Sequence, residues 1–258
     1  MKTVINDKNP FGYNRYGFLW EKLYERPAKG NHLDYGAYDG NVLKEMSGSE
    51  VIEKGIGVDL NSEIVEKSLD SCPENIQLEC IESNCKIPYG DNYFDTVSIL
   101  DVIEHVYEQQ SVIEELHRVL KPNGLMVITV PKKHIFSFLD LGNWKFIFPK
   151  LHKIVYSLSH SSEEYEYRYV TCPNGLIGDI DIRKRWHQHF NEKELSSLLE
   201  KSGFHVIEFD GAGFFCRILH AVSLPLPDKI KKKFDRLMAA DMRIFSSCHL
   251  FAVAKKIN

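Results

Sequence analysis

A glycine-containing turn, followed at a fixed distance by an acidic residue, constrains this chain more than any other feature. Residues 33–40 read Leu-Asp-Tyr-Gly-Ala-Tyr-Asp-Gly, and Asp59 follows Gly36 by 23 positions. This order predicts a strand, a turn, a helix and a second strand that ends in a carboxylate, the layout that places a nucleoside ribose at a strand tip. Dinucleotide enzymes and adenosyl-binding enzymes share the layout, so the rest of the chain has to separate them.

The composition indicates a chain that can bury a full core. It has 258 residues, of which 43% are hydrophobic, so a single α/β domain over residues 1–258 is expected rather than two domains. The net charge of −4 argues against a nucleic-acid partner, which would favour a basic face. The first residues lack the apolar core of a signal peptide, and no run reaches transmembrane length, which favours a cytoplasmic protein. The six cysteines form no CxxC pair and are expected to be reduced and mostly packed.

Strand-like and helical patterns alternate along most of the chain. Strands are expected near residues 32–35, 55–59, 76–81, 94–100, 125–130, 204–209 and 249–254. Helices are expected near 18–26, 41–46 and 111–120, after a cap at Asn61 or Ser62, and from Asn191 to Gly203. Glu194 lies three positions after Asn191, which is the spacing of a capping box. The alternation implies right-handed crossovers and a parallel sheet.

Three segments depart from this alternation. Residues 1–29 predict an N-terminal helical cover. Residues 132–185 are long, aromatic and without a strand period, and they predict a lid or substrate insertion over the C-terminal edge of the sheet, where ligands bind in such folds. Residues 214–240 join an apolar stretch to a run of lysines and predict a helical insertion.

Five ordered blocks of the sequence carry a resemblance to a known family. The blocks are residues 33–40, 57–60, 87–95, 100–106 and 117–124. Together they resemble the class I S-adenosylmethionine-dependent methyltransferases, and they are similar to the type 11-like branch that methylates small molecules. The resemblance implies S-adenosylmethionine as cofactor and a Rossmann-like, seven-stranded, mostly parallel sheet flanked by helices. The implied strand order is near 3-2-1-4-5-7-6, with the last strand antiparallel.

The same resemblance implies roles for individual residues. Gly36 and Gly40 would let the backbone approach the methionine part of the cofactor, where a side chain would collide with it. Asp59 would accept hydrogen bonds from both ribose hydroxyls, and Ser83 and Asn84 fall where the family contacts adenine. The other expected cofactor-binding residues are Tyr13, Arg15, Asp34, Ala37, Leu60, Leu100 and Asp101.

Two residues depart from the family pattern. Tyr38 stands where the family has its middle glycine, and a positive φ at this position would strain the tyrosine. Ser83 replaces the acidic residue that many relatives use to hold the adenine amino group. A non-catalytic cofactor-binding module therefore stays an alternative.

The chemistry of methyl transfer leaves the protein two tasks, positioning and proton removal. An activated methyl group moves by in-line displacement, which positioning promotes, and a hydroxyl acceptor also needs a base. The catalytic candidates are His105 and Asp101, since residues 100–106 lead from the cofactor edge into the next helix and histidine suits neutral pH. The substrate-binding candidates are His134, Trp144, Tyr169, Arg183, His187 and His189.

The pair His187 and His189 leaves several roles open. The two histidines alternate on one side of an extended segment, where substrate binding, proton transfer and a structural role are all consistent with the pattern. As a metal site the pair is weak, because two histidines without a third ligand rarely suffice, and no metal is expected.

The expected function is methyl transfer to a small-molecule acceptor at oxygen, such as a sugar, a glycan-pathway compound or another secondary metabolite. A lipid-linked or quinone-like phenol is the alternative acceptor, favoured by apolar-basic stretches at 144–156 and 214–236. A dinucleotide oxidoreductase is disfavoured because residues 36–40 do not read GxGxxG. The apolar-basic stretches also leave open a peripheral membrane contact, a homodimer face and simple lid packing.

Overall fold

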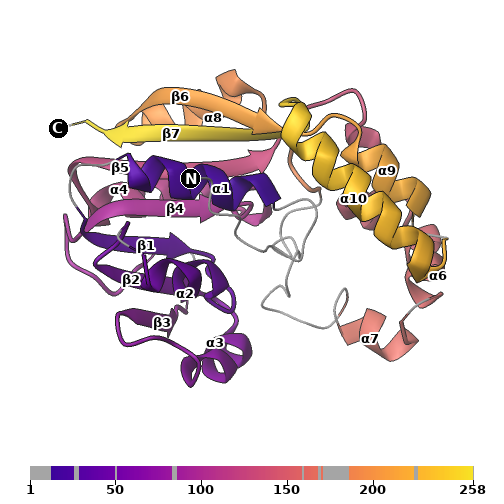
Figure 1. Ribbon diagram of the computed structural model, residues 1–258, viewed down its shortest axis with the longest axis horizontal. Helices are drawn as coiled ribbons and strands as arrows, with labels where there is room; N and C mark the ends of the chain where they lie inside the picture. The colour runs from indigo at the N-terminus through magenta and orange to yellow at the C-terminus, as the bar shows by residue number, and fades with distance from the viewer. Residues whose placement is uncertain are drawn as a thin grey trace.

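A seven-stranded sheet in the order β3-β2-β1-β4-β5-β7-β6 organises the molecule (Figure 1). The computed structural model describes residues 13–25, 29–49, 51–82, 86–158, 160–167, 170, 186–223 and 226–257. The strands are β1 (Asn31–Tyr35), β2 (Lys54–Asp59), β3 (Ile76–Cys80), β4 (Phe94–Leu100), β5 (Leu120–Pro131), β6 (Phe204–Ala212) and β7 (His249–Lys256). Strands β1 to β5 pair in parallel, and β7 is antiparallel to β5 and β6. The strand order and the antiparallel last strand predicted from the family resemblance are confirmed.

Helices cover both faces of the sheet, and the sheet separates the hydrophobic core into two clusters. Helices α4 (Gln109–Val119) and α8 (Glu192–Lys201) bury Ile113, Leu116 and Leu199 against one face. Helices α1 (Tyr13–Tyr24), α2 (Asn41–Ser47) and α3 (Ser62–Leu69) contribute to the cluster on the other face. A sheet covered on both faces needs apolar residues on both sides of its strands. The last six residues of β5 are all buried, and all except Thr129 are apolar.

Two helix starts follow the sequence prediction. Asn61 Oδ1 accepts a hydrogen bond from the Ile64 amide at 3.2 Å and caps α3. Asn191 and Glu194 form both halves of a capping box at the start of α8. Each cap satisfies amides that the first helical turn leaves without a partner.

Two insertions extend beyond the C-terminal ends of the parallel strands. The first contains the short 3-10 helix η2 (Ser137–Leu139), α5 (Leu141–Ile147), α6 (Pro149–Ser157) and α7 (Ser162–Glu166). The second, between β6 and β7, contains α9 (Cys216–Ser223) and α10 (Asp228–Ile244), so its helical part runs past the expected end at residue 240. Figure 1 shows α6, α9 and α10 beyond the tips of β4, β5 and β6, with α1 lying across the sheet. No helix among the described residues has the length and apolarity to cross a membrane.

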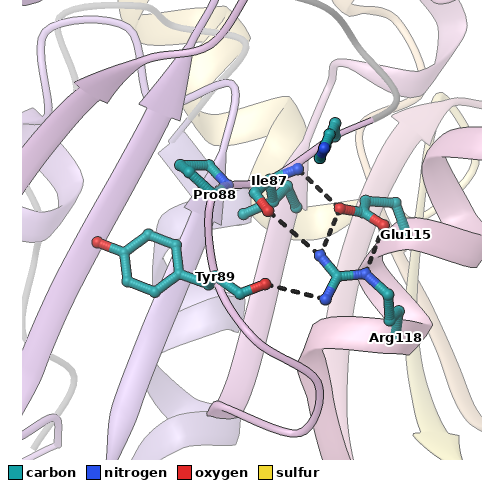
Figure 2. A pocket seen from close by; sticks show the side chains of 6 residues that line it. Ile87, Pro88, Tyr89, Glu115 and Arg118 are labelled. Carbon is teal, nitrogen blue, oxygen red and sulfur yellow. Dashed lines mark hydrogen bonds and ion pairs between the residues drawn. The ribbon is translucent and has the colours of Figure 1, made fainter.

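Two of the sequence blocks meet at the other end of β4 and support the fold there. Arg118 donates to the Tyr89 carbonyl at 2.9 Å, to the Ile87 carbonyl at 3.2 Å and to Glu115 Oε1 at 2.6 Å, as Figure 2 shows. Glu115 Oε1 also accepts from the Ile87 amide at 2.7 Å. The pocket lined by these side chains lies near the start of β4, whereas Asp101 follows its end. These contacts give the sequence blocks 87–95 and 117–124 a structural role, because they hold the two segments together near the start of β4.

Candidate functional site

The C-terminal ends of β1, β2 and β4 converge at the point where the strand order reverses. Strand β1 lies between β2 and β4, and the chain leaves it in one direction for β2 and later returns on its other side for β4. Ligands of open α/β sheets bind in the crevice outside the carboxyl ends of the strands at such a point. Gly36, Asp59 and Asp101 sit at or just after these strand ends.

The turn after β1 orients Asp59. The Tyr38 amide donates to Asp59 Oδ2 at 2.8 Å, and the Asn61 amide donates to Oδ1 at 2.9 Å. Each oxygen of an ionised carboxylate accepts more than one hydrogen bond, so both retain acceptor capacity. In this geometry Tyr38 has a φ of 53°, a left-handed conformation that costs a non-glycine residue about 1–2 kcal/mol. The strain expected at Tyr38 is therefore present.

The two glycines of the turn also have an explanation within the protein itself, while their expected contact with the cofactor stays a prediction. Gly36 and Gly40 adopt φ of 79° and 69°, and both close approaches are to protein side chains. A Cβ on Gly36 would lie 2.4 Å from Val102 Cγ2, and one on Gly40 would lie 2.7 Å from Leu78 Cδ2. The described contacts thus require glycine for backbone conformation and for packing, so collision with a ligand is not needed to explain them.

Arg15 and Asp101 join α1 to the end of β4. Arg15 Nη1 lies 2.5 Å from Asp101 Oδ2, and Thr129 Oγ1 donates to Asp101 Oδ1 at 2.8 Å. Burial raises the pKa of Asp101, but the charges of Arg15 and His249 and the Thr129 hydrogen bond outweigh it and leave this pKa below its ordinary value. Asp101 is therefore a carboxylate at neutral pH.

Asp34 lies inside β1, with 4% of the residue exposed. Ser98 Oγ donates to its Oδ1 at 2.6 Å. Burial raises the pKa of Asp34 to about 6, against the opposing effects of the Ser98 hydrogen bond and the Arg15 charge. A role for Asp34 in cofactor binding stays a prediction, and the contact seen here is to β4.

Three histidines and two carboxylates gather beside this crevice, and we refer to Glu104, His105, Asp140, His187 and His189 as the histidine cluster. His187 Nδ1 lies 2.5 Å from Asp140 Oδ2, and His189 Nε2 lies 2.7 Å from the same oxygen. The ring of His105 packs on that of His187 with centroids 4.8 Å apart. Glu104 Oε1 lies 3.8 Å from His105 Nε2 and 3.9 Å from His187 Nε2. The expected common side of His187 and His189 is thus the side that faces Asp140.

Charge within the cluster is fixed by its hydrogen bonds. Burial raises the pKa of Asp140, but the hydrogen bonds from His187 and His189 outweigh it and hold this pKa far below its ordinary value. Because an ionised carboxylate only accepts hydrogen bonds, Nδ1 of His187 and Nε2 of His189 carry the donated protons. When His187 is neutral, its Nε2 therefore presents a lone pair toward Glu104.

Contacts from three elements hold the cluster in place. Glu104 and His105 belong to the 3-10 helix η1 (Ile103–His105), which follows β4. Asn143 of α5 accepts from the His187 amide at 2.8 Å and donates to the His187 carbonyl at 3.0 Å. Gln109 Nε2 donates to the Ile103 carbonyl at 2.7 Å and to Gln188 Oε1 at 2.9 Å. The cluster is thus preorganised by backbone and amide contacts around it.

The remaining predicted residues are dispersed. Ala37 is buried in the turn, and Leu60 and Leu100 pack against the two core clusters. His134 packs edge-on against Phe214, with ring centroids 4.7 Å apart, and Trp144 Nε1 donates to the Phe138 carbonyl at 3.4 Å. Tyr13 begins α1, but its side chain lies outside the description, as do the residues Ser83, Asn84, Tyr169 and Arg183.

Four residues of the site were not expected from the sequence. Glu104 adjoins His105 within the block 100–106, so its position was visible although its role was not. Asp140, Thr129 and His249 reach the site through tertiary contacts, and no local pattern marks them. Burial lowers the pKa of His249 to about 4, so this histidine is neutral at pH 7.

Comparison with known proteins shows the family of this chain. The family described as "Methyltransferase domain" matches residues 14–208. The chain belongs to this family of class I S-adenosylmethionine-dependent methyltransferases. It is 24% identical over 218 residues to the ubiquinone/menaquinone biosynthesis C-methyltransferase UbiE of Francisella tularensis subsp. novicida, covering 80% of this chain and 79% of that protein.

Two further relatives extend the comparison. The demethylmenaquinone methyltransferase of Staphylococcus epidermidis is 33% identical over 128 residues, which are 48% of this chain and 52% of that protein. The phosphoethanolamine N-methyltransferase 2 of Haemonchus contortus, solved in complex with S-adenosyl-L-methionine, matches with a TM-score of 0.59 and 16% identity, covering 98% of this chain and 54% of that one. The structural likeness supports the shared fold of the methyltransferase.

The methyltransferase uses S-adenosylmethionine, and the crevice has groups suited to that cofactor. Asp59, at the tip of β2, has acceptor capacity for ribose hydroxyls. The guanidinium of Arg15 points to the end of β4 and has a buried Nε with no hydrogen-bond partner among the described residues. A partly buried cationic donor beside the crevice fits the carboxylate of an amino acid.

Proposed function

We propose that this methyltransferase transfers the methyl group of S-adenosylmethionine to the oxygen of a small acceptor that carries an ionisable hydroxyl group. The observation that supports the proposal is the histidine cluster, which begins three residues after Asp101, at the end of β4. A hydroxyl must lose its proton during transfer, and imidazole accepts protons near neutral pH. An amine acceptor that arrives as the free base would need no such group to start the displacement.

The residues of this chain divide the work. Asp59 would hold the ribose of the cofactor and Arg15 its amino-acid carboxylate, and the cofactor would supply an activated methyl group. His105 and His187 take up the proton of the acceptor, while Asp140 keeps His187 in a fixed orientation through the 2.5 Å contact. Glu104, which is 1% exposed, supports positive charge on either ring.

Carbon methylation of a quinone-like phenol is the second candidate, and similarity to UbiE favours it. A deprotonated phenol activates its own ring carbons, so proton removal by the cluster serves this reaction as well. Exposed apolar side chains on α5 and α6, among them Ile147, Leu151 and Ile154, offer a surface for an apolar tail. The two candidates share the first chemical step and differ in the atom that receives the methyl group.

The test uses S-adenosylmethionine labelled with 13C in the methyl group. The protein is incubated with panels of hydroxylated sugars, phenols and quinols, and the labelled product is identified by NMR, which separates methyl bound to oxygen from methyl bound to carbon. Label on oxygen supports the proposal, and label on a ring carbon supports the second candidate. Methylation of amines alone would refute both, whereas cofactor binding without turnover on any panel would favour a non-catalytic module.

A further inference from the structure

We infer that Glu104, His105 and His187 form a binding site for a divalent transition-metal ion of the zinc type. Each residue offers one ligand atom, and the three atoms lie within 4.8 Å of one another. The sequence alone showed two histidines without a third ligand. The structure brings a buried carboxylate and a third histidine from η1 to the side of His187.

The separations suit an intervening ion better than direct hydrogen bonds. Glu104 Oε1 lies 3.8 Å from His105 Nε2 and 3.9 Å from His187 Nε2, beyond the usual range of about 2.7–3.2 Å for a hydrogen bond. Ligand atoms at about 2.0–2.2 Å from a tetrahedral ion are roughly 3.3–3.6 Å apart. A contraction of roughly 0.2–0.6 Å in the two Glu104 distances, and of at most about 1.5 Å between the two histidine ligand atoms, would therefore complete the coordination.

Asp140 plays the supporting part that metal-bound histidines usually require. Its Oδ2 accepts from His187 Nδ1 at 2.5 Å, which leaves Nε2 of His187 as the lone-pair donor on the side of Glu104. A carboxylate that holds the outer nitrogen of a ligating histidine fixes the tautomer and raises its basicity as a ligand. The adjacent contact between Asp140 and His189 at 2.7 Å is already a hydrogen bond, so His189 belongs to the support and not to the ligand set.

The ligand types also limit the ion. Two histidines and one glutamate leave a fourth position open, which is the donor set of catalytic zinc sites, whereas Mg²⁺ prefers oxygen ligands alone. The side chains of His105 and His187 are 20% and 15% exposed, so a further ligand can approach from solvent. If the proposed function is correct, the open position of the ion would bind the acceptor oxygen and lower the pKa of the acceptor hydroxyl. Only this consequence rests on the proposed function. His105 would then act by holding the ion.

The decisive experiment measures metal binding without cofactor or acceptor. The full chain is dialysed against a chelator and titrated by calorimetry with Zn²⁺ alone, with Mg²⁺ as the comparison, and Co²⁺ absorbance reports the ligand geometry. We expect one Zn²⁺ per chain, much weaker Mg²⁺ binding, and a loss of affinity of about 10–100-fold in Asp140→Asn. His105→Ala and His187→Ala should lose more, and thermal melts of each variant establish that it is folded.

Two control variants separate this site from other metal-binding groups. His205→Ala removes an exposed histidine of β6 and should bind Zn²⁺ like the wild type. Cys216→Ser removes part of a second group that could hold a metal, formed by Cys216, Cys248 and His249, and should also keep the affinity. Absence of Zn²⁺ binding, retention of affinity in His187→Ala, or its loss in Cys216→Ser would overturn the inference. Zn²⁺ binding in a protein that methylates nothing would refute the proposed function and leave the metal site intact.

Discussion

Arg15 and Asp101, which are 86 positions apart in the sequence, are joined by a contact of 2.5 Å between Nη1 and Oδ2. This pair connects the N-terminal helix to the strand end beside which the histidine cluster lies. Their side chains are 17% and 18% exposed, so water screens the pair only in part. Helix α1 is therefore a component of the site and not only a cover on the sheet.

The Arg15–Asp101 pair should show strong energetic coupling. In a double-mutant cycle with Arg15→Met and Asp101→Asn, we expect a coupling of about 1–3 kcal/mol in the free energy of unfolding, because each single change leaves its partner partly buried and uncompensated. Urea denaturation without cofactor provides the measurement. The exposed pair Glu63–Lys67 serves as the control and should couple much less. Equal coupling in the two pairs would contradict the prediction.

Asp59→Asn should weaken binding of S-adenosylhomocysteine by roughly 10–100-fold, the equivalent of about 1.5–3 kcal/mol for a charged hydrogen-bond partner. The amide keeps one acceptor but cannot receive hydrogen bonds at both atoms. Calorimetric titration measures the dissociation constant. Asp39→Asn, in the same turn and with its carboxylate bonded to Asn41, is the matched control and should retain wild-type affinity.

Tyr38 should respond to substitution in the reverse of the usual order. Because its φ is 53°, we expect Tyr38→Gly to be more stable than Tyr38→Ala by about 1 kcal/mol, although alanine is normally the less costly replacement. Chemical denaturation of both variants measures the difference. An alanine variant as stable as the glycine variant would show that the turn relaxes to a negative φ.

His105→Ala should reduce turnover by about 10²–10⁴-fold, the range typical of a lost proton-transfer group, with nearly unchanged affinity for S-adenosylhomocysteine. The same loss of turnover is expected if the His105 imidazole accepts the proton of the acceptor and if it binds a metal ion that lowers the pKa of the acceptor hydroxyl. Single-turnover rates and calorimetry provide the two readouts, and His205→Ala is the matched control. Wild-type turnover in His105→Ala would remove this residue from the mechanism.

The alternation of strand and helix periods allowed a parallel sheet to be predicted, and the family resemblance implied the order of its seven strands. The predicted ends of strands and helices differ from the observed ends where contacts between distant parts of the chain determine them. Strand β5 begins at Leu120, before the expected start at residue 125, because Phe94 pairs with Leu120 ahead of a shift in register over residues 121–124. Helix α10 continues to Ile244, past the end of the apolar-basic run that marked the insertion.

The histidine cluster could be predicted only in part. His105, His187 and His189 were selected for their residue type and local spacing, but the contact that unites two of them is to Asp140, which lies 47 positions from His187. No periodicity in the sequence links η1, the segment before α5 and the segment before α8. These three segments are distant in the sequence and come into contact only through the tertiary structure. Lys132 forms an isolated parallel bridge with Phe190. This bridge places the residues that follow β5 beside the segment that carries His187 and His189.

Asp34 gives the fold a pH dependence of defined sign. Its pKa rises from an ordinary value of 3.8 to about 6 through burial. A raised carboxyl pKa means that the folded state favours the protonated form. Its contribution to stability is therefore complete below the ordinary pKa and is lost as pH rises through about 6. At pH 7 the buried charge then costs on the order of 2–3 kcal/mol relative to low pH.

Asp34→Asn should remove this dependence, because the amide does not titrate and its oxygen can still accept from Ser98. Urea unfolding from pH 4 to 8 without cofactor should show the variant gaining stability over the wild type mainly between pH 4 and about 6, with a constant difference at higher pH. Ser98→Ala deletes the 2.6 Å hydrogen bond that opposes the pKa rise. Its stability should therefore fall at a higher pH than that of the wild type. A constant difference between wild type and Asp34→Asn would place the ionisation of Asp34 outside this pH range.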